Sequence, residues 1–313
     1  MRQRIGRMVG EETASRLWMG TFHSIFSRIL RQESIHLGFA QNFTIYDASD
    51  SKSLIKSIIK DMQLDDKTYK PGSVASRISM AKNRLILPSA YMADRQNLEA
   101  DMHAKMPAIG QIYMQYWQRC RQSNVMDFDD LLLYTWILFT EHPDIAQKWE
   151  DRFHFVLVDE YQDTNYAQHL IVWLLTQHRQ RVCVVGDDAQ SIYSFRGANI
   201  DNILRFQEQY KGSRLFKLEQ NYRSTQTIVS AANSLIGHNR GQIHKEVYSR
   251  KEMGEPISVI QTYSDIDEAT AVMRCIKEFR NNEQIPYSHM AVLYRTNAQS
   301  RAFEEVMRKS SIP

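Results

Sequence analysis

Two short apolar runs that each end in acidic residues are the main feature of the hydrophobic pattern. The first run, residues 153–158, reads Phe-His-Phe-Val-Leu-Val and leads directly into Asp159 and Glu160. The second run, residues 181–185, leads through Gly186 into another acidic pair. Apolar runs of this length, without polar alternation, are typical of strands buried on both faces of a parallel sheet. The pattern therefore predicts two buried strands with acidic carboxyl ends.

The segment between the two runs predicts a crossover helix. Its apolar residues recur at helical spacing: Leu170, Ile171, Trp173, Leu174 and Leu175. Parallel strands need such a crossover, so we expect the two strand ends to be neighbours. Ligands of open α/β sheets bind at this edge, where one carboxylate can hold Mg²⁺ and a second can polarise water. A single acidic strand end is more often a solvated loop or a helix cap. The interpretation as a magnesium and water site therefore depends on the occurrence of two acidic strand ends in succession.

The rest of the pattern predicts two α/β units, the first with an all-helical insertion. Helices are expected over most of 1–45 with a break at Gly20, and over 51–62, 74–85, 109–121, 127–141, 225–238, 265–281 and 299–309. Further strands are expected over 214–218, 256–263 and 290–295. The predicted boundaries are 1–45 and 127–218 for the first unit, 46–126 for its insertion and 219–313 for the second unit. Asp47 is the expected N-cap of the first insertion helix.

Composition permits about two ordinary domains in 313 residues, since 43% of them are hydrophobic. No apolar run approaches the roughly 20 residues of a membrane span. Cys120, Cys183 and Cys275 are odd in number and far apart, which fits a reducing compartment, and Cys183 is expected inside a buried strand. No His/Cys cluster has zinc spacing.

Charge is unevenly distributed along the chain, although the net value is only +3. Residues 1–126 hold 18 Lys/Arg against 11 Asp/Glu, or +7, and the remainder holds 21 against 25, or −4. The N-terminal part is therefore favoured as a surface for a phosphate backbone, with an ordinary solvated face as the alternative.

A phosphate-binding loop is missing from these 313 residues. Such a loop reads Gly-x-x-x-x-Gly-Lys-Ser/Thr, and no Gly is followed by Lys in this chain. The usual grip on a triphosphate is therefore absent from this sequence.

Four segments resemble motifs of the UvrD, Rep and PcrA type of superfamily 1 ATP-dependent DNA helicases. They are residues 156–165 (VLVDEYQDTN, motif II), 184–198 (VVGDDAQSIYSFRGA, motif III), 218–225 (LEQNYRST, motif IV) and 292–301 (VLYRTNAQSR, a DNA-contacting segment). The resemblance implies an α/β fold of two RecA-like, P-loop NTPase-type parallel-sheet cores, both incomplete here. It also implies ATP and Mg²⁺ as cofactors, and 3′ to 5′ movement on single-stranded DNA with duplex unwinding. It further implies an internal segment of a longer protein, which begins after the phosphate-binding loop, and we expect this segment to have negligible ATPase activity by itself.

The same resemblance implies roles at the nucleotide. Asp159 would coordinate Mg²⁺ and Glu160 would activate water. Gln190, whose amide can donate to a phosphate oxygen and accept from the attacking water, would couple the γ-phosphate to DNA. Tyr222 would stack near the adenine, and Arg223 would reach the γ-phosphate across the domain cleft, because its planar fork meets phosphate bidentately. Without the flanking motif, a surface Tyr and a solvated Arg would be the preferred interpretation.

On the DNA side, the implied contacts fall into three groups. Thr21, Phe22 and His23 resemble a phosphate-contacting segment; Phe128, Tyr193 and Phe195, with Arg196, correspond to positions that stack on bases; Arg295 and Asn297 match contacts of the second core. Aromatic stacking holds single strands without reading sequence. For Phe128, a core anchor at a helix start is an equal alternative.

Two departures and two alternatives remain open. Phe195 stands where many relatives have Trp, and Asp188-Ala189 replaces the commoner Ala-Asp order. The expected partners are single-stranded DNA and single/double-strand junctions in a bacterial cytoplasm, in repair or replication, with no membrane. The alternatives are a catalytically inactive, helicase-like module that binds single-stranded DNA, and a helicase-nuclease subunit of the AddA or RecB kind.

Overall fold

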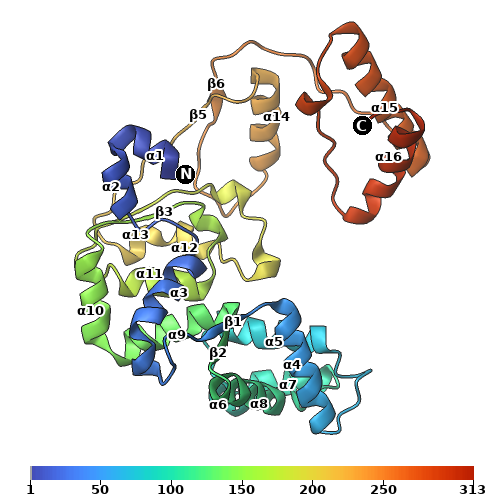
Figure 1. Cartoon of the computed structure of the whole chain (residues 1–313). Coiled ribbons are helices and arrows are strands. Elements are labelled where there is room, and N and C mark those ends of the chain that lie inside the picture. The colour runs from blue at the N-terminus through green and yellow to red at the C-terminus, as the bar shows by residue number, and fades with distance from the viewer. Residues whose placement is uncertain (1) are drawn as a thin grey trace. The chain divides into compact units, whose positions relative to one another are not determined.

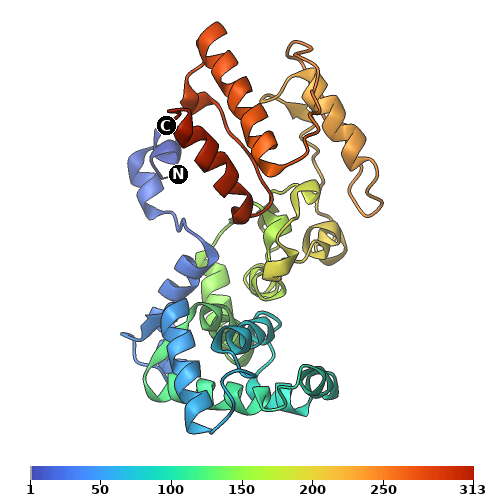
Figure 2. The same cartoon turned by 90° about the vertical axis from the view of Figure 1, so that its right-hand side faces the viewer.

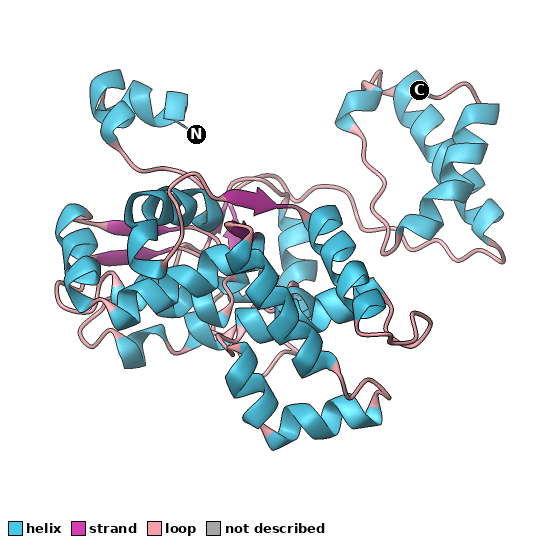
Figure 3. Cartoon of the chain, turned by 60° about the horizontal axis from the view of Figure 1, so that its bottom comes forward, coloured by secondary structure: helices cyan, strands magenta, loops and turns pink. Residues whose placement is uncertain are grey.

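The computed structural model describes residues 2–313, which fall into two compact units (Figure 1). Unit 1 comprises residues 2–217 and 239–245, and unit 2 comprises residues 218–238 and 246–313. Both are mixed α/β structures in which helices predominate and the sheets are small (Figure 3). Within the described residues, no helix is both long and apolar enough to cross a membrane.

The helices and strands have the following bounds. Unit 1 contains α1 (Arg2–Val9), α2 (Glu11–Arg16), α3 (Phe22–Glu33), β1 (Thr44–Tyr46), α4 (Ala48–Asp61), α5 (Pro71–Asn83), α6 (Pro88–Ala93), α7 (Arg95–His103), α8 (Ile109–Gln122), β2 (Val125–Asp127), α9 (Phe128–Glu141), α10 (Pro143–Arg152), β3 (Val156–Val158), α11 (Tyr166–Leu174), β4 (Val182–Val184), α12 (Asp201–Leu204) and α13 (Phe206–Gln209). Unit 2 contains β5 (Gln220–Asn221), α14 (Gln226–Ile236), β6 (Tyr248–Ser249), α15 (Asp265–Asn282) and α16 (Asn297–Lys309).

Strands β3 and β4 pair in parallel, with Val158 opposite Val184, and α11 connects them along the chain. The predicted neighbourhood of the two acidic strand ends is thereby confirmed. The expectation of strands buried on both faces is wrong, because Leu157 is 75% exposed and Cys183 is also exposed. Successive side chains of a strand point to opposite faces, and only the face of Val158 is covered by other described residues.

Three predicted strands do not form. Residues 214–218, 256–263 and 290–295 have no ladder partner in the described part of the chain, and their apolar side chains stay exposed, as at Leu218 and Val259. An apolar, β-branched run favours a strand only where another strand satisfies its backbone groups. Conversely, β1 and β2 were not expected, because each has only three residues and its partner is 81 positions away in sequence.

Each helix that the sequence pattern predicted is present, but the pattern did not predict α6, α7, α10, α12 and α13. Asp47 caps α4 and receives backbone hydrogen bonds from Ser49 and Asp50 at 2.7 and 2.8 Å, as predicted. Helices α4 to α8 lie between β1 and β2 in sequence and gather around a hydrophobic core of their own (Figures 1 and 2). Helix α9 is buried along most of its length and packs against α3, α5, α10 and α11. This helix joins the insertion to the acidic strand ends.

Candidate nucleotide and nucleic-acid sites

Glu160, the second residue of the acidic pair after β3, has a strained backbone conformation. Glu160 has φ 52° and ψ 45°, in the left-handed region of backbone conformation, which residues other than Gly seldom adopt. Asp159 accepts a hydrogen bond from the Glu160 backbone nitrogen at 3.0 Å. Both side chains are exposed, and neither forms an ion pair within residues 2–313. Strain of this kind persists where the surrounding structure enforces it, and the turn presents both carboxylates to solvent.

Gln162 ties the acidic end of β3 to the loop after β4. Its amide nitrogen donates to Glu160 Oε2 at 2.7 Å, and its amide oxygen accepts from the Asp187 backbone nitrogen at 3.1 Å. Gln162 is only 1% exposed, so this amide is held on both sides. The Ser191 hydroxyl adds a bond to the Gln162 carbonyl oxygen at 3.2 Å.

The path continues from Asp187 to Gln190. The Gln190 amide donates to Asp187 Oδ2 at 2.8 Å, and Asp187 Oδ1 accepts from the Ala189 backbone nitrogen at 3.0 Å. Gln190 itself is exposed. The structure therefore brings Asp159, Glu160 and Gln190 to one sheet edge, linked by Gln162 and Asp187. The two linking residues were in the recognised motifs but were not singled out as site residues.

Lys245 neutralises the acidic pair after β4. Its ammonium contacts Asp187 and also lies 2.8 Å from Asp188 Oδ1. Burial opposes ionisation of Asp187, but hydrogen bonds from Lys245 and Gln190 outweigh it and lower the pKa of this carboxyl. Asp188 is 4% exposed and also accepts from the Ile243 backbone nitrogen at 2.8 Å. Asp188, the acid that occurs where relatives more often have Ala, thus anchors the segment 239–245.

Gly186 permits the close approach of the two strand ends. A Cβ atom at this position would lie 2.5 Å from Gln162 Oε1, 2.8 Å from Ile203 Cδ1 and 3.2 Å from the Tyr161 backbone nitrogen. Real Cβ atoms do not tolerate contacts this short without a shift of the neighbours. A larger residue at this position would therefore displace the side chains of Gln162 and Ile203.

On the predicted DNA side, His23 and Phe128 lie together. Their ring centroids are 5.8 Å apart in an edge-on arrangement, and Phe128 is 52% exposed. Burial lowers the pKa of His23, and Asp129 opposes this shift only partly. Thr21 caps α3 through the Ser24 backbone nitrogen at 3.3 Å. The ring of Phe22 packs partly against the core, 5.7 Å from the ring of Phe26.

A groove adjoins Phe128 where the insertion meets α9. It has a volume of about 300 Å³, and helices α4, α5 and α9 all contribute to its walls. Among its lining residues are Tyr46, Lys52, Ser79, Phe128 and Asp129. Phe128 is therefore both half-exposed and part of the wall of a concave surface.

A second aromatic group follows β4. The Tyr193 and Phe195 rings lie 6.0 Å apart, and the Arg196 guanidinium is 5.4 Å from the centre of each. Phe195 is 73% exposed and Tyr193 is 38% exposed. A guanidinium beside two exposed rings combines a base-stacking surface with a charge for phosphate.

The remaining predicted residues belong to unit 2. Tyr222 is 76% exposed and donates to Gln220 Oε1 at 3.1 Å. Arg223 is exposed on the turn that the Asn221 side chain caps. Arg295 is also exposed, and Asn297 is the first residue of α16.

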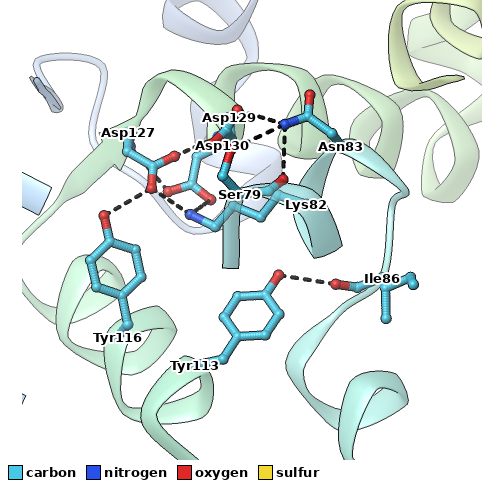
Figure 4. Close-up of polar contacts among 9 residues, drawn as sticks. All are labelled: Ser79, Lys82, Asn83, Ile86, Tyr113, Tyr116, Asp127, Asp129 and Asp130. Carbon is cyan, nitrogen blue, oxygen red and sulfur yellow. Dashed lines mark hydrogen bonds and ion pairs between the residues drawn. The ribbon is translucent and has the colours of Figure 1, made fainter. Parts of the chain in front are cut away.

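A buried ionic cluster between the insertion and α9 was not anticipated (Figure 4). Lys82 is 1% exposed, and its ammonium lies 2.6 Å from Asp127 Oδ2 and 2.7 Å from Asp130 Oδ1. The Tyr116 hydroxyl donates to Asp127 Oδ2 at 2.8 Å. Burial and the neighbouring Asp127 raise the pKa of Asp130 to about 7. The only sequence signal was a lysine on the apolar face of a helix, among Val74, Ile78 and Ala81.

Comparison with known proteins defines the class. The UvrD/REP helicase N-terminal domain family matches residues 1–211, and the UvrD-like helicase C-terminal domain family matches residues 216–313. The chain therefore belongs to the UvrD/REP helicase family.

Individual relatives extend this result. The chain is 40% identical over all 313 residues to an ATP-dependent DNA helicase PcrA of Leuconostoc citreum. Proteins of the same name from Staphylococcus aureus strain Mu50 and Staphylococcus epidermidis are 41% and 42% identical over the same length. The chain covers 41% of the first relative and 42% of the other two, or about two-fifths of their length.

Proposed function

We propose that these residues are part of an ATP-dependent DNA helicase that moves 3′ to 5′ on single-stranded DNA and unwinds duplexes. The observation that carries the proposal is the hydrogen-bonded path from Glu160 through Gln162 and Asp187 to Gln190. It couples two acidic strand ends at a single sheet edge, where ligands of α/β folds bind. Two RecA-like cores, with residues 46–126 inserted in the first, are the corresponding fold proposal.

Asp159 and Glu160 fit the chemistry of a magnesium nucleotide. No group of three His, Cys, Asp or Glu residues within 2–313 could hold a metal by itself. Magnesium at nucleotide sites usually takes one or two carboxylates and completes its shell with waters and phosphates. Asp159 supplies such a carboxylate, and Glu160, oriented by Gln162, would polarise the attacking water. When bound, Mg²⁺ would neutralise charge on the phosphates.

Gln190, Tyr222 and Arg223 complete the proposed nucleotide roles. The Gln190 amide, held by Asp187, would sense the γ-phosphate. Tyr222 and Arg223, exposed on unit 2, would stack on the adenine and bind the γ-phosphate respectively. Their exposure in the described structure leaves both side chains free for a ligand.

The proposed DNA contacts lie on both units. The stacking rings are Phe128, beside the groove and His23, and the pair Tyr193 and Phe195 with Arg196. Thr21, Phe22, Arg295 and Asn297 would add contacts to the strand. Single-stranded DNA and its junctions with duplex, in a bacterial cytoplasm, are the proposed partners, with ATP and Mg²⁺ as cofactors.

A chimaera tests the proposal. In it, the 313 residues replace the aligned part of the Leuconostoc citreum relative. We expect ATP hydrolysis that single-stranded DNA stimulates, and duplex unwinding. Glu160→Gln should lower the hydrolysis rate by about 10²–10⁴-fold, the typical contribution of a general base, without weakening DNA binding.

Glu141→Gln is the matched control, because Glu141 is an exposed carboxylate at the end of α9. Full hydrolysis by the Glu160→Gln chimaera would refute the assignment of the catalytic base. A chimaera that binds single-stranded DNA with salt-dependent affinity but hydrolyses no ATP would favour the inactive binding module instead.

A further inference from the structure

A side-chain hydrogen bond joins the end of the acidic motif to the helical insertion. Asn165 is the N-cap of α11, where its Oδ1 accepts from the Gln168 backbone nitrogen at 2.8 Å. Its amide nitrogen donates to Asn83 Oδ1 at 2.5 Å. Asn83 is the last residue of α5, 82 positions earlier in sequence. One amide pair therefore bridges the core and the insertion.

The same Asn83 amide reaches α9 with its other end. Its nitrogen donates to Asp129 Oδ1 at 2.9 Å and to the Ser79 carbonyl oxygen at 2.8 Å (Figure 4). Asp129 directly follows Phe128, the exposed ring beside the groove. A continuous side-chain path thus leads from Asn165 through Asn83 to the start of α9.

The direction of every bond in this path is fixed. A backbone carbonyl oxygen only accepts hydrogen bonds, so Asn83 must turn its amide nitrogen toward Ser79, and the same nitrogen meets Asp129. Its oxygen then faces Asn165, which must donate, and this leaves Asn165 Oδ1 for the Gln168 backbone. Reversal of either amide would place two hydrogen-bond donors, or two acceptors, against each other. The path therefore has one low-energy arrangement.

The surroundings hold Asn83 in place. The preceding residue, Lys82, is buried in ion pairs with Asp127 and Asp130 at the start of α9. At the other end, the Asn165 carbonyl oxygen accepts from Asn202 Nδ2 at 3.2 Å. Because both ends are anchored, a displacement of the acidic loop changes the strength of the Asn83 bonds directly.

We propose that Asn83 is a positioning residue that couples the loop of Asp159 and Glu160 to the DNA-stacking ring of Phe128. The inference rests on the proposed function, which places nucleotide at Asp159 and Glu160 and single-stranded DNA at Phe128. Asn83 contacts neither ligand. Through Asn165 and Asp129, it makes the position of the acidic loop depend on whether DNA is bound at Phe128, and the reverse.

Hydrogen exchange of the 313-residue chain, with and without an oligothymidylate of about 20 nucleotides, tests the coupling. For the unsubstituted chain, we expect DNA to slow exchange both around residues 126–131 and in the remote segment 159–166. In Asn83→Ala, the first effect persists and the remote effect disappears. Affinity for the oligonucleotide falls by about threefold to tenfold, because the stabilisation of the DNA-bound state through the Asn83 bonds is lost.

Two further variants sharpen the test. Asn97→Ala is the matched control, because Asn97 lies on the insertion and its amide binds Asp94 at 3.1 Å without reaching the core. Asn165→Asp keeps an N-cap oxygen for Gln168 but loses the donor to Asn83. It should therefore abolish the DNA-dependent slowing of exchange at residues 159–166, as Asn83→Ala does. It replaces Asn83→Ala in the test if that variant does not fold.

The possible failures are distinct. Retention of DNA-dependent protection at 159–166 in both Asn83→Ala and Asn165→Asp would overturn the coupling role and leave the proposed function intact. Protection confined to residues 126–131 in the unsubstituted chain would overturn it as well. No binding of the oligonucleotide by the unsubstituted chain would overturn the proposed DNA interface itself, and the coupling with it.

Discussion

The side-chain oxygen of Gln162 accepts a hydrogen bond from the backbone nitrogen of Asp187 at 3.1 Å. This bond fastens the loop after β3 to the loop after β4, and the nitrogen of the same amide orients Glu160. A buried amide with both ends engaged leaves the carboxylate little freedom to turn. The geometry of the proposed catalytic base therefore depends on a residue that need not touch the nucleotide.

Gly186→Ala should destabilise unit 1. The new methyl group would meet Gln162 Oε1 and Ile203 Cδ1, so both side chains must move, and the bond between Gln162 and the Asp187 backbone would weaken. We expect a loss of about 1–3 kcal/mol in the free energy of unfolding, measured by urea denaturation. Gly72→Ala is the control, because a Cβ there meets nothing within 4 Å, and this change should be neutral or slightly stabilising. Equal effects of the two substitutions would contradict the packing argument.

Lys82→Ala should be among the most destabilising single changes in the chain. It leaves Asp127 and Asp130 buried without their cation, and loss of one partner of a buried ion pair costs about 3–5 kcal/mol. Urea denaturation measures the loss. Lys56→Ala, at an exposed position on α4, should change the free energy of unfolding by no more than about 0.5 kcal/mol. A tolerated Lys82→Ala would mean that the cluster does not hold the insertion on α9.

Mild acid should destabilise the chain in part through His23. Burial lowers the pKa of this imidazole in the folded state below its ordinary value of 6.5. As the pH falls through 6.5, the unfolded chain binds a proton before the folded chain does. The stabilisation is therefore complete above pH 6.5 and is lost below it.

The test compares thermal unfolding of the unsubstituted chain and of His23→Gln at about pH 7.5 and pH 5. The variant should lose less stability on acidification. Some dependence on pH remains in the variant, because burial also lowers the pKa of His169. Identical losses in the two proteins would show that His23 titrates normally when folded.

Phe195→Ala should weaken binding of single-stranded DNA without affecting the fold. Its ring is 73% exposed, so its removal leaves no cavity. Loss of one stacking ring costs about 1–3 kcal/mol of binding free energy, measured by fluorescence anisotropy with a labelled oligonucleotide. Phe216→Ala is the matched control, since Phe216 is 77% exposed in the same unit but lies outside the four motifs. A similar loss in both variants would indicate a nonspecific apolar effect.

The sequence by itself determined most of the longer helices and the adjacency of the two acidic strand ends. Apolar spacing and a capping aspartate suffice for a helix such as α4, because its hydrogen bonds are local. The β3–β4 pairing also followed from local signals, because two strands joined by one short crossover helix usually lie side by side and parallel. The motifs gave Asp159, Glu160 and Gln190 as candidate site residues, and the family they indicated is the one to which the chain belongs.

Tertiary structure decided which apolar runs became strands and which polar residues were buried. Residues 256–263 have strand-like composition, but a strand also needs a partner, and composition does not specify one. The contacts of Lys82 with Asp130, and of Asn83 with Asn165, join segments separated by 48 and 82 positions. Apart from the position of Lys82 on the apolar face of its helix, nothing in the local pattern distinguishes these polar residues from solvated ones. Their partners become neighbours only when the insertion packs on α9, because burial and long-range hydrogen bonding are properties of the folded chain.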